Sequence, residues 1–362
     1  MRPPESARGG SNVDDTFDLL TLALLPDVSP RTVRQLCARV PLDAALSRPD
    51  FHADLLPPRA RGLLRSGEAR RRAEEERRRC AELGVSLVGR DEPAYPSHLR
   101  EIFDPPPVLY ARGRLEAHEG DVSVAIVGSR AATASGRALA RGMGRDLAAA
   151  GATVVSGLAR GIDTAAHRGA LDAAGRTVAV LGSGLDRIYP PENEALAAAI
   201  AERGALVSEF PLGAIPHPAN FPRRNRIIAG WSRAVVVVEA AERSGALVTA
   251  RAALDEGREV LAVPGHPSQA ASAGCNQLIR DGAALVRGAA DVAQEIGLPL
   301  QVAQEGPPGD HVLAALRDDA PSSLEELARR SGLETPALLV RLTELELADK
   351  VRRLPGALFV RA

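Results

Sequence analysis

The residues from 217 to 230 form the stretch whose side chains best suit binding chemistry. They read His-Pro-Ala-Asn-Phe-Pro-Arg-Arg-Asn-Arg-Ile-Ile-Ala-Gly, and no acidic residue occurs between positions 210 and 238. A guanidinium suits a phosphate and an aromatic ring suits a base, so the pattern is typical of a loop that binds single-stranded nucleic acid. The alternative is a solvated Pro-rich loop that leads into a core element. The predicted contacts are Phe221, Arg223, Arg224, Asn225 and Arg226.

Three glycine-containing turns each follow a short apolar run that we predict to be a strand. Glycine allows a ligand to approach the backbone closely, and the helix start after such a turn offers unpaired N–H groups to a phosphate. Carboxyl ends of parallel strands share one edge of a sheet, so the turns predict an anion site there. The alternative is glycine used only for packing. The predicted contacts are Gly128, Ser129, Arg130, Gly157, Gly161, Gly182, Ser183 and Gly184.

The turns do not match the common nucleotide-binding motifs. Neither Gly128-Ser129-Arg130 nor Gly182-Ser183-Gly184 continues into the G-x-G-x-x-G fingerprint of dinucleotide-binding proteins. A P-loop needs a lysine, and Lys350 is the only lysine. These absences disfavour NAD dehydrogenases and P-loop ATPases. A groove that combines the turns, Arg130 and the 217–230 loop fits a sugar-phosphate strand better than one small phosphate.

Few side chains suit catalysis. His167 lies within a predicted helix, four residues after Asp163. We interpret it as a structural histidine, and the alternative is an Asp163–His167 pair at the rim of the site. Glu239 ends a strand of valines, where we expect it to cap a neighbouring backbone or hold an arginine. We find no Ser/His/Asp set, no acid pair and no metal-ligand spacing. The expectation is a protein with no catalytic residues, no metal and no cofactor.

The elements that position these residues alternate regularly from residue 122 onward. Apolar runs without polar interruption alternate with helical segments, which indicates a parallel sheet covered on both faces. We therefore predict an α/β fold, an extended Rossmann-like, doubly wound parallel sheet. The predicted strands are 108–111, 122–127, 153–156, 177–181, 205–208, 234–239, 260–263 and 284–286, and the predicted helices are 135–150, 162–174, 192–203, 247–256 and 276–281.

Smaller modules flank this domain. We expect a disordered N-terminus (1–12), a small helical domain (13–80, SAM-like or helix-hairpin-helix-like), the Rossmann domain (81–297), a linker (298–310) and a winged-helix domain (311–362). Leu25–Val33 resembles a helix-hairpin-helix turn, but Asp27 and Ser29 stand where its glycines would be. We therefore expect that segment to pack rather than to bind DNA. In the last module, capping boxes at 322–326, Gly332 and a hairpin at 351–360 predict three helices and a wing.

The composition of the 362-residue chain is that of a soluble globular protein, with 45% hydrophobic and 25% charged residues. Lys and Arg (45) balance Asp and Glu (46), so any affinity for a polyanion must come from local patches. Cys37, Cys80 and Cys275 are too few and too widely spaced for a disulfide framework, which favours a reducing compartment. We expect a cytoplasmic protein without a signal peptide or a membrane span.

Taken in order, the motifs of residues 85–290 resemble the DNA processing protein A family (DprA, also called Smf). The resemblance is carried by Ala125–Arg130, Ser156–Asp163, Ala166-His167, Leu181–Asp186, Ile188–Pro190, Ser208–Pro211, Asn220–Gly230, Ser244–Ala250 and Val263–Gly265.

The resemblance implies an extended Rossmann fold that forms homodimers through this domain and binds single-stranded DNA. It further implies that the protein receives and protects incoming DNA in natural transformation, helps to load the RecA recombinase and is not an enzyme. Family contacts carry over to Gly128, Ser129 and Arg130, and to Phe221, Arg223, Asn225 and Arg226. Family members often place a lysine in the groove, where this chain has only arginines such as Arg224 or Arg233.

Two other functions stay open on the residues alone. A nucleotide phosphoribohydrolase on a related Rossmann fold would carry a P-G-G-x-G-T-x-x-E motif, whereas Glu239–Ala246 lacks its paired glycines. A transcriptional regulator would use the winged helix, but its third helix carries Glu344 and Glu346 and is a poor match to the major groove.

Overall fold

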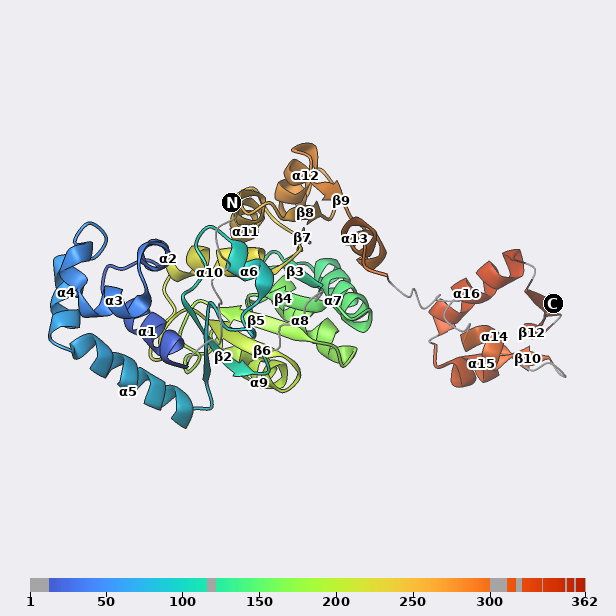
Figure 1. Cartoon of the computed structure of the whole chain (residues 1–362). Coiled ribbons are helices and arrows are strands. Elements are labelled where there is room, and N and C mark those ends of the chain that lie inside the picture. The colour runs from blue at the N-terminus through green and yellow to red at the C-terminus, as the bar shows by residue number, and fades with distance from the viewer. Residues whose placement is uncertain are drawn as a thin grey trace, which may run out of the picture. The chain divides into compact units, whose positions relative to one another are not determined.

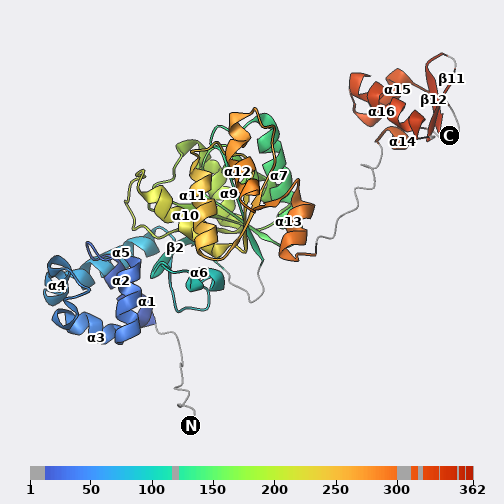
Figure 2. The same ribbon diagram turned by 90° about the horizontal axis from the view of Figure 1, so that it is seen from above.

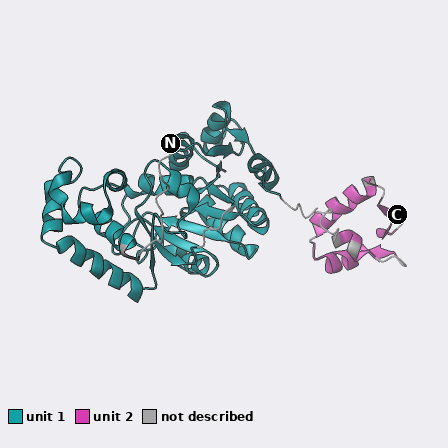
Figure 3. Ribbon diagram, viewed as in Figure 1, with its two compact units in different colours: residues 1–300 teal, residues 301–362 magenta. Residues whose placement is uncertain are grey.

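The computed structural model describes residues 13–115, 122–299, 311–316, 321–333, 335–348, 350–354 and 356–361. The chain forms two compact units, residues 1–300 and 301–362 (Figure 3). The expected disordered N-terminus and most of the expected linker lie outside the described residues. Within the described ranges, no helix combines the length and apolarity that crossing a membrane requires.

The first unit is built on a nine-stranded sheet with the order β1-β2-β6-β5-β4-β3-β7-β8-β9 (Figure 1). From β6 to β9 every neighbouring pair is parallel, as predicted. At the other edge, β2 runs antiparallel to β6 and β1 antiparallel to β2. The strands are β1 (Ser86–Gly89), β2 (Val108–Gly113), β3 (Ser123–Val127), β4 (Thr153–Ser156), β5 (Thr177–Leu181), β6 (Ala205–Ser208), β7 (Ala234–Val237), β8 (Glu259–Ala262) and β9 (Ala284–Leu285).

The doubly wound parallel sheet expected from the sequence is confirmed, and two antiparallel pairs extend it at the β1 edge. The sequence pattern identifies the β2 strand but carries no information on its direction, and it does not reveal β1, whose first two residues are not buried. In the middle of the sheet β3, β4, β5, β6 and β7 are buried at every position, because helices cover both faces.

Two helical layers enclose the sheet (Figures 1 and 2). One face carries α6 (Ser97–Glu101), α10 (Asn220–Trp231), α11 (Gly245–Asp255) and α12 (Ala273–Arg280), which share a core with the inner side of the strands. The other face carries α7 (Ala134–Ala149), α8 (Ile162–Asp172), α9 (Glu194–Arg203) and α13 (Ala289–Ile296).

The N-terminal helices pack against the β1–β2 edge and share a core with it. They are α1 (Val13–Ala23), α2 (Pro30–Arg39), α3 (Leu42–Ser47), α4 (Pro58–Arg65) and α5 (Glu68–Glu82). Leu20 and Leu36 lie in the same apolar cluster as Tyr110 and Leu181 of the sheet. On the surface, α5 carries Arg–Glu pairs such as Arg72–Glu68, which fits the solvated charged helix that its sequence predicts. Asp27 adopts a left-handed conformation (φ 60°) between α1 and α2.

The segment 217–230, expected to begin as a loop, is mostly the helix α10. Pro222 is its third residue, and proline is tolerated in the first turn, where its missing N–H has no helical partner. Ile227, Ile228 and Trp231 are buried on one side and hold the helix against the sheet. The Pro-rich composition at the start of the segment concealed the helical spacing of its apolar residues.

The second unit has the three helices and the hairpin that the sequence predicts. They are α14 (His311–Ala315), α15 (Leu324–Ser331) and α16 (Thr335–Leu347), with a sheet of order β10-β12-β11 from β10 (Ser322–Ser323), β11 (Val351–Leu354) and β12 (Leu358–Arg361). Ser323 caps α15 by accepting the Glu326 N–H at 3.2 Å, and Gly332 ends the helix at φ 71°. This is a winged-helix arrangement.

Candidate functional site

A pocket of about 740 Å³ opens at the carboxyl ends of β3 and β7, where the strand order reverses. Ligands of doubly wound sheets bind at this switch point. Of the predicted contacts, Gly128, Ser129, Arg130, Phe221, Arg224 and Asn225 line this switch-point pocket. Its other lining residues are Val127, Ala159, Asp163, Tyr189, Pro216, Pro218, Pro222, Ile228, Ala241, Ser244, Gly245, Ala246, Val248 and Thr249.

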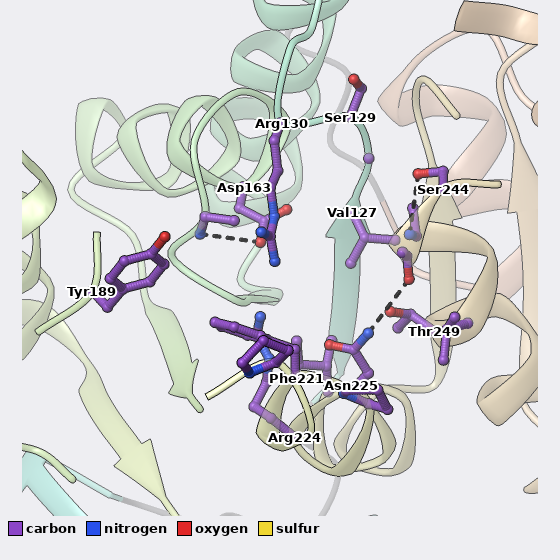
Figure 4. A pocket seen from close by; sticks show the side chains of 18 of the residues that line it. Val127, Ser129, Arg130, Asp163, Tyr189, Phe221, Arg224, Asn225, Ser244 and Thr249 are labelled. Atoms are coloured by element: carbon purple, nitrogen blue, oxygen red, sulfur yellow. Dashed lines mark hydrogen bonds between the residues drawn. The ribbon is translucent and has the colours of Figure 1, made fainter. Parts of the chain in front are cut away.

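Phe221 lies at the centre of one wall of the pocket (Figure 4). Its ring is partly exposed and rests on Gly182, where a β-carbon would come within 3.2 Å of Phe221 Cδ1. The guanidinium of Arg130 lies 5.0 Å from the ring centroid and that of Arg224 lies 5.9 Å from it. The ring is thus held in place by cations and backbone while part of it stays open to the pocket.

Arg130 and Arg224 have different surroundings, although both contact the ring. Arg130 is exposed and extends into the pocket (Figure 4). Arg224 is only 4% exposed, and its Nη1 donates to the Val180 carbonyl oxygen at 2.6 Å. Burial lowers the pKa of Arg224 to about 10, which leaves it charged at neutral pH. Arg130 is therefore accessible to a phosphate, while Arg224 supports the ring from within the protein.

The turn after β4 is already occupied by a carboxylate of the chain itself. Asp163 Oδ2 accepts the Gly157 N–H at 3.1 Å and the Ala159 N–H at 3.3 Å. Burial raises the pKa of this carboxyl group, and the nearby Arg224 opposes that rise. The amides that we expected to bind a phosphate are thus engaged by Asp163. Gly161, at φ 79°, packs against the backbone of Ser129 and Arg130 rather than opening to the pocket.

The turn after β5 is also closed. Ser183 is buried and its hydroxyl donates to the Arg187 carbonyl oxygen at 2.7 Å. The Gly184 N–H donates to the Ala214 carbonyl oxygen at 2.9 Å. Gly182 contributes by leaving room for the edge atoms Cδ1 and Cε1 of the Phe221 ring close to the backbone. Of the three glycine turns, only Gly128-Ser129-Arg130 borders the switch-point pocket as a whole.

Arg223 and Arg226 face away from the pocket, toward Glu209 at the end of β6. Arg226 forms a short ion pair with Glu209, whose side chain is only 3% exposed. The Nε of Arg223 lies 3.7 Å from the same carboxylate. Burial raises the pKa of Glu209, and both arginines oppose that rise. These two guanidiniums neutralise a buried acid. The stretch without acidic residues in the sequence is therefore in contact with an acidic residue in the folded protein.

The opposite wall of the pocket is the start of α11 (Figure 4). Ser244 caps this helix by accepting the Ala246 N–H at 3.2 Å, and Gly245 has open space where a β-carbon would stand. Asn225 donates to the Gly245 carbonyl oxygen at 3.4 Å, which connects α10 to this wall. The positive end of α11 thus adds to the charge of Arg130.

His167 and Glu239 have the structural roles that the sequence predicts. His167 is fully buried, and its Nδ1 lies 2.7 Å from Thr177 Oγ1. Glu239 accepts the Thr133 N–H at 2.9 Å and caps the start of α7. Among the residues that the structure describes, no group of three or more His, Cys, Asp or Glu is placed to hold a metal ion.

Sequence reasoning missed Tyr189, Asp163 and the α11 wall. Ser244-Gly245 follows β7, so the rule that located the other three turns also applies to this one. Tyr189 lies in a loop after β5 with no periodic pattern, and its position beside Phe221 depends on the fold. The turn that Asp163 binds contains Leu158 in a left-handed conformation (φ 59°), which no sequence pattern indicates.

The sequence matches two family models. Residues 86–297 match the model described as DNA recombination-mediator protein A, which covers more than half of the chain. The chain belongs to the DprA family. Residues 298–357 match the DprA winged helix domain, which agrees with the fold of the second unit.

Relatives of known name agree with this assignment. The chain is 41% identical over 285 residues to Protein Smf of Escherichia coli, covering 75% of this chain and 76% of that protein. The DprA structure from Streptococcus pneumoniae superposes with a TM-score of 0.65 at 33% identity, covering 77% of this chain and 97% of that one. A DprA structure from Helicobacter pylori, described for its single-stranded DNA binding mode, matches with a TM-score of 0.52 at 29% identity and covers 59% of this chain and 94% of that one.

Proposed function

We propose that this DprA family member is a DNA-processing protein that binds single-stranded DNA in the switch-point pocket. The observation that carries the proposal is the partly exposed Phe221 ring, which is fixed over Gly182 and lies beside the exposed Arg130. Ser129, Arg130 and the start of α11 suit a phosphate, and the Phe221 ring suits a base. The Helicobacter pylori relative, which binds single-stranded DNA, supports the same ligand.

In this proposal the predicted site residues have two kinds of role. Gly128, Ser129, Arg130, Phe221 and Asn225 contact the strand. Others hold the contacting groups in place, and these are Gly157, Gly161, Gly182, Ser183, Gly184, Arg223, Arg224 and Arg226.

Titration of a fluorescent oligonucleotide tests the proposal. Arg130→Ala should weaken single-strand binding and make the slope of log affinity against log salt less negative by about 0.7, because one phosphate contact is lost. Phe221→Ala should weaken binding by about 1–3 kcal/mol. Arg168→Ala and Phe51→Ala alter an exposed arginine and an exposed ring outside the pocket and serve as matched controls. If both pocket variants bind as tightly as the controls, the strand does not lie in this pocket.

We propose further that the protein receives and protects incoming DNA in natural transformation, helps to load RecA and has no enzymatic activity. A cytoplasmic location fits this role. Incubation with nucleoside monophosphates tests the enzymatic alternative. Base release that Glu239→Gln abolishes would show a phosphoribohydrolase. A preference for one duplex sequence over a single strand would instead indicate a transcriptional regulator that uses the winged helix.

We propose that the Rossmann domain forms a homodimer. A second hollow, of about 610 Å³, lies between α11, α12 and the edge strands β8 and β9. Leu254 (60% exposed) belongs to it and Leu285 (48% exposed) adjoins it on β9, and both would be covered by a partner. Leu254→Glu together with Leu285→Glu should convert dimers to monomers in analytical ultracentrifugation, while unchanged dimers would exclude this face.

We also propose the domain boundaries expected from the sequence, with a helical domain at 13–80, the Rossmann domain at 81–297 and the winged-helix domain at 311–362. Limited proteolysis tests them. Cleavage between 298 and 310 should release the last domain, whereas the core shared by α1–α5 and the sheet should protect the junction near residue 80.

A further inference from the structure

Tyr189 is an aromatic side chain at the rim of the pocket for which the interactions above provide no role. Among the described residues only three aromatic side chains are exposed, namely Phe51, Phe103 and Tyr189. Phe103 is covered by the guanidiniums of Arg31 and Arg34, at 5.0 and 4.9 Å from its centroid. Phe51 lies in the N-terminal helical segment, away from the pocket lining. Tyr189 is thus the exposed ring that borders the site.

The geometry of Tyr189 relative to Phe221 suits two bases rather than one. The ring centroids are 6.0 Å apart and the ring planes are inclined by 47°. Rings at that angle cannot sandwich a single flat base between them. Each ring instead has a face of its own, and the two rings lie on neighbouring sides of the pocket (Figure 4). Neighbouring bases of one strand could occupy these faces, because every base has a π-face that stacks without regard to sequence.

A small hollow of about 20 Å³ borders both Phe221 and Tyr189, and two exposed arginines line it. Its lining includes Arg130, Arg160, Tyr189, Pro190 and Phe221. Arg160 is paired with Glu192 at the surface, and both side chains are about half exposed. An exposed ion pair contributes little free energy, so Arg160 can exchange Glu192 for a phosphate at little cost. The hollow therefore brings two aromatic rings and a second cation together at one side of the pocket.

We propose that Tyr189 forms a second base-stacking subsite, which the strand reaches by passing from Phe221 toward Arg160. The base next to the one on Phe221 stacks on the Tyr189 ring, and Arg160 meets the phosphate that follows. This inference rests on the proposed single-strand binding and adds the direction in which the strand leaves Phe221. The ligand class is any single-stranded DNA segment long enough to reach beyond the Phe221 base.

Affinity measured against oligothymidylate length tests the inference. With the wild-type protein, the nucleotide that first reaches Tyr189 should raise affinity by about five- to 150-fold. Tyr189→Phe should keep this step. Tyr189→Ala and Tyr189→Leu should remove most of it while binding the shorter oligomers as the wild type does. Leucine preserves apolar contact with Phe221 but has no flat face, so it separates support of Phe221 from stacking.

Two results would overturn the inference. An equal loss of affinity at every length in Tyr189→Ala would mean that the ring only supports Phe221. Unchanged affinity at every length would mean that the strand leaves the pocket in another direction. Failure of the proposed function looks different, because the wild type would then show no single-strand affinity that depends on Arg130 and Phe221.

Discussion

Gly157→Ala adds one methyl group at the place where Arg224 passes the β4 turn. The new β-carbon would lie 2.6 Å from Arg224 Nη2 and closer still to Nη1, so the guanidinium must move. Arg224 is buried and has little room to do so. Overpacking a core costs about 1–3 kcal/mol, and losing the bond from the charged Nη1 to the Val180 carbonyl adds about 1.5–3 kcal/mol. We expect a destabilisation of about 3–5 kcal/mol.

The assay is urea unfolding of the variant beside a matched control, Gly142→Ala. Gly142 lies within α7 and nothing lies within 4 Å of an added β-carbon. The same substitution there should stabilise the protein by about 0.5–1 kcal/mol, because alanine favours helix. In an Arg224→Ala background, Gly157→Ala should cost almost nothing, since the clash is gone. A Gly157→Ala protein as stable as the wild type, or a cost unchanged without Arg224, would refute the reasoning.

Three further predictions concern groups elsewhere in the chain. Arg226→Ala should destabilise the protein by about 3–5 kcal/mol in urea unfolding, because it leaves Glu209 buried with a weakened counter-charge, whereas Glu209→Gln in the same background should recover part of the loss. Burial lowers the pKa of His167 to about 3, so the unfolded chain binds a proton below about pH 6.5 that the folded protein does not. As the pH is lowered from about 6.5 to about 3, the free energy of unfolding should therefore fall by up to about 1.4 kcal/mol per pH unit. His167→Gln should reduce this dependence on pH, and an equal dependence in both proteins would contradict the assignment. Ser323→Ala should cost about 1 kcal/mol and lower the melting temperature of the winged-helix unit by a few degrees in calorimetry, while Ser323→Asp should restore it; no change would mean that the cap does not form.

Local patterns predicted the architecture well, because strand, helix and cap signals lie close together in sequence. The strands β4, β5 and β6 begin and end where the apolar runs do, and Gly332 ends α15 as expected. The direction of β2 was not predictable, since antiparallel and parallel edge strands have similar patterns. The helix α10 was missed because proline and glycine at 222 and 230 conceal the spacing of its buried residues.

Site prediction was limited by contacts between segments distant in sequence. The acid-free window begins at residue 210, one position after Glu209, which is the carboxylate that binds Arg226. A count of charges along the chain cannot show that this acid lies beneath the arginines. In the same way, exposed and buried arginines look alike in sequence, so Arg130 and Arg224 received the same role. Only the burial of each side chain in the folded protein distinguishes an arginine that can bind a ligand, such as Arg130, from one that supports the site, such as Arg224.

The carboxylate of Asp163 has a consequence for what the fold can accept. In dinucleotide-binding sheets, amides at such a turn receive a phosphate of the cofactor. Here the chain provides its own carboxyl group, covalently attached and already bonded to the Gly157 and Ala159 amides. The amides of the β4 turn are therefore already hydrogen-bonded within the chain, and no nucleotide phosphate is needed to satisfy them. The nearby Arg224 opposes this buried charge, so a strand that crosses the β4 turn must meet side chains such as Arg160 rather than the backbone amides.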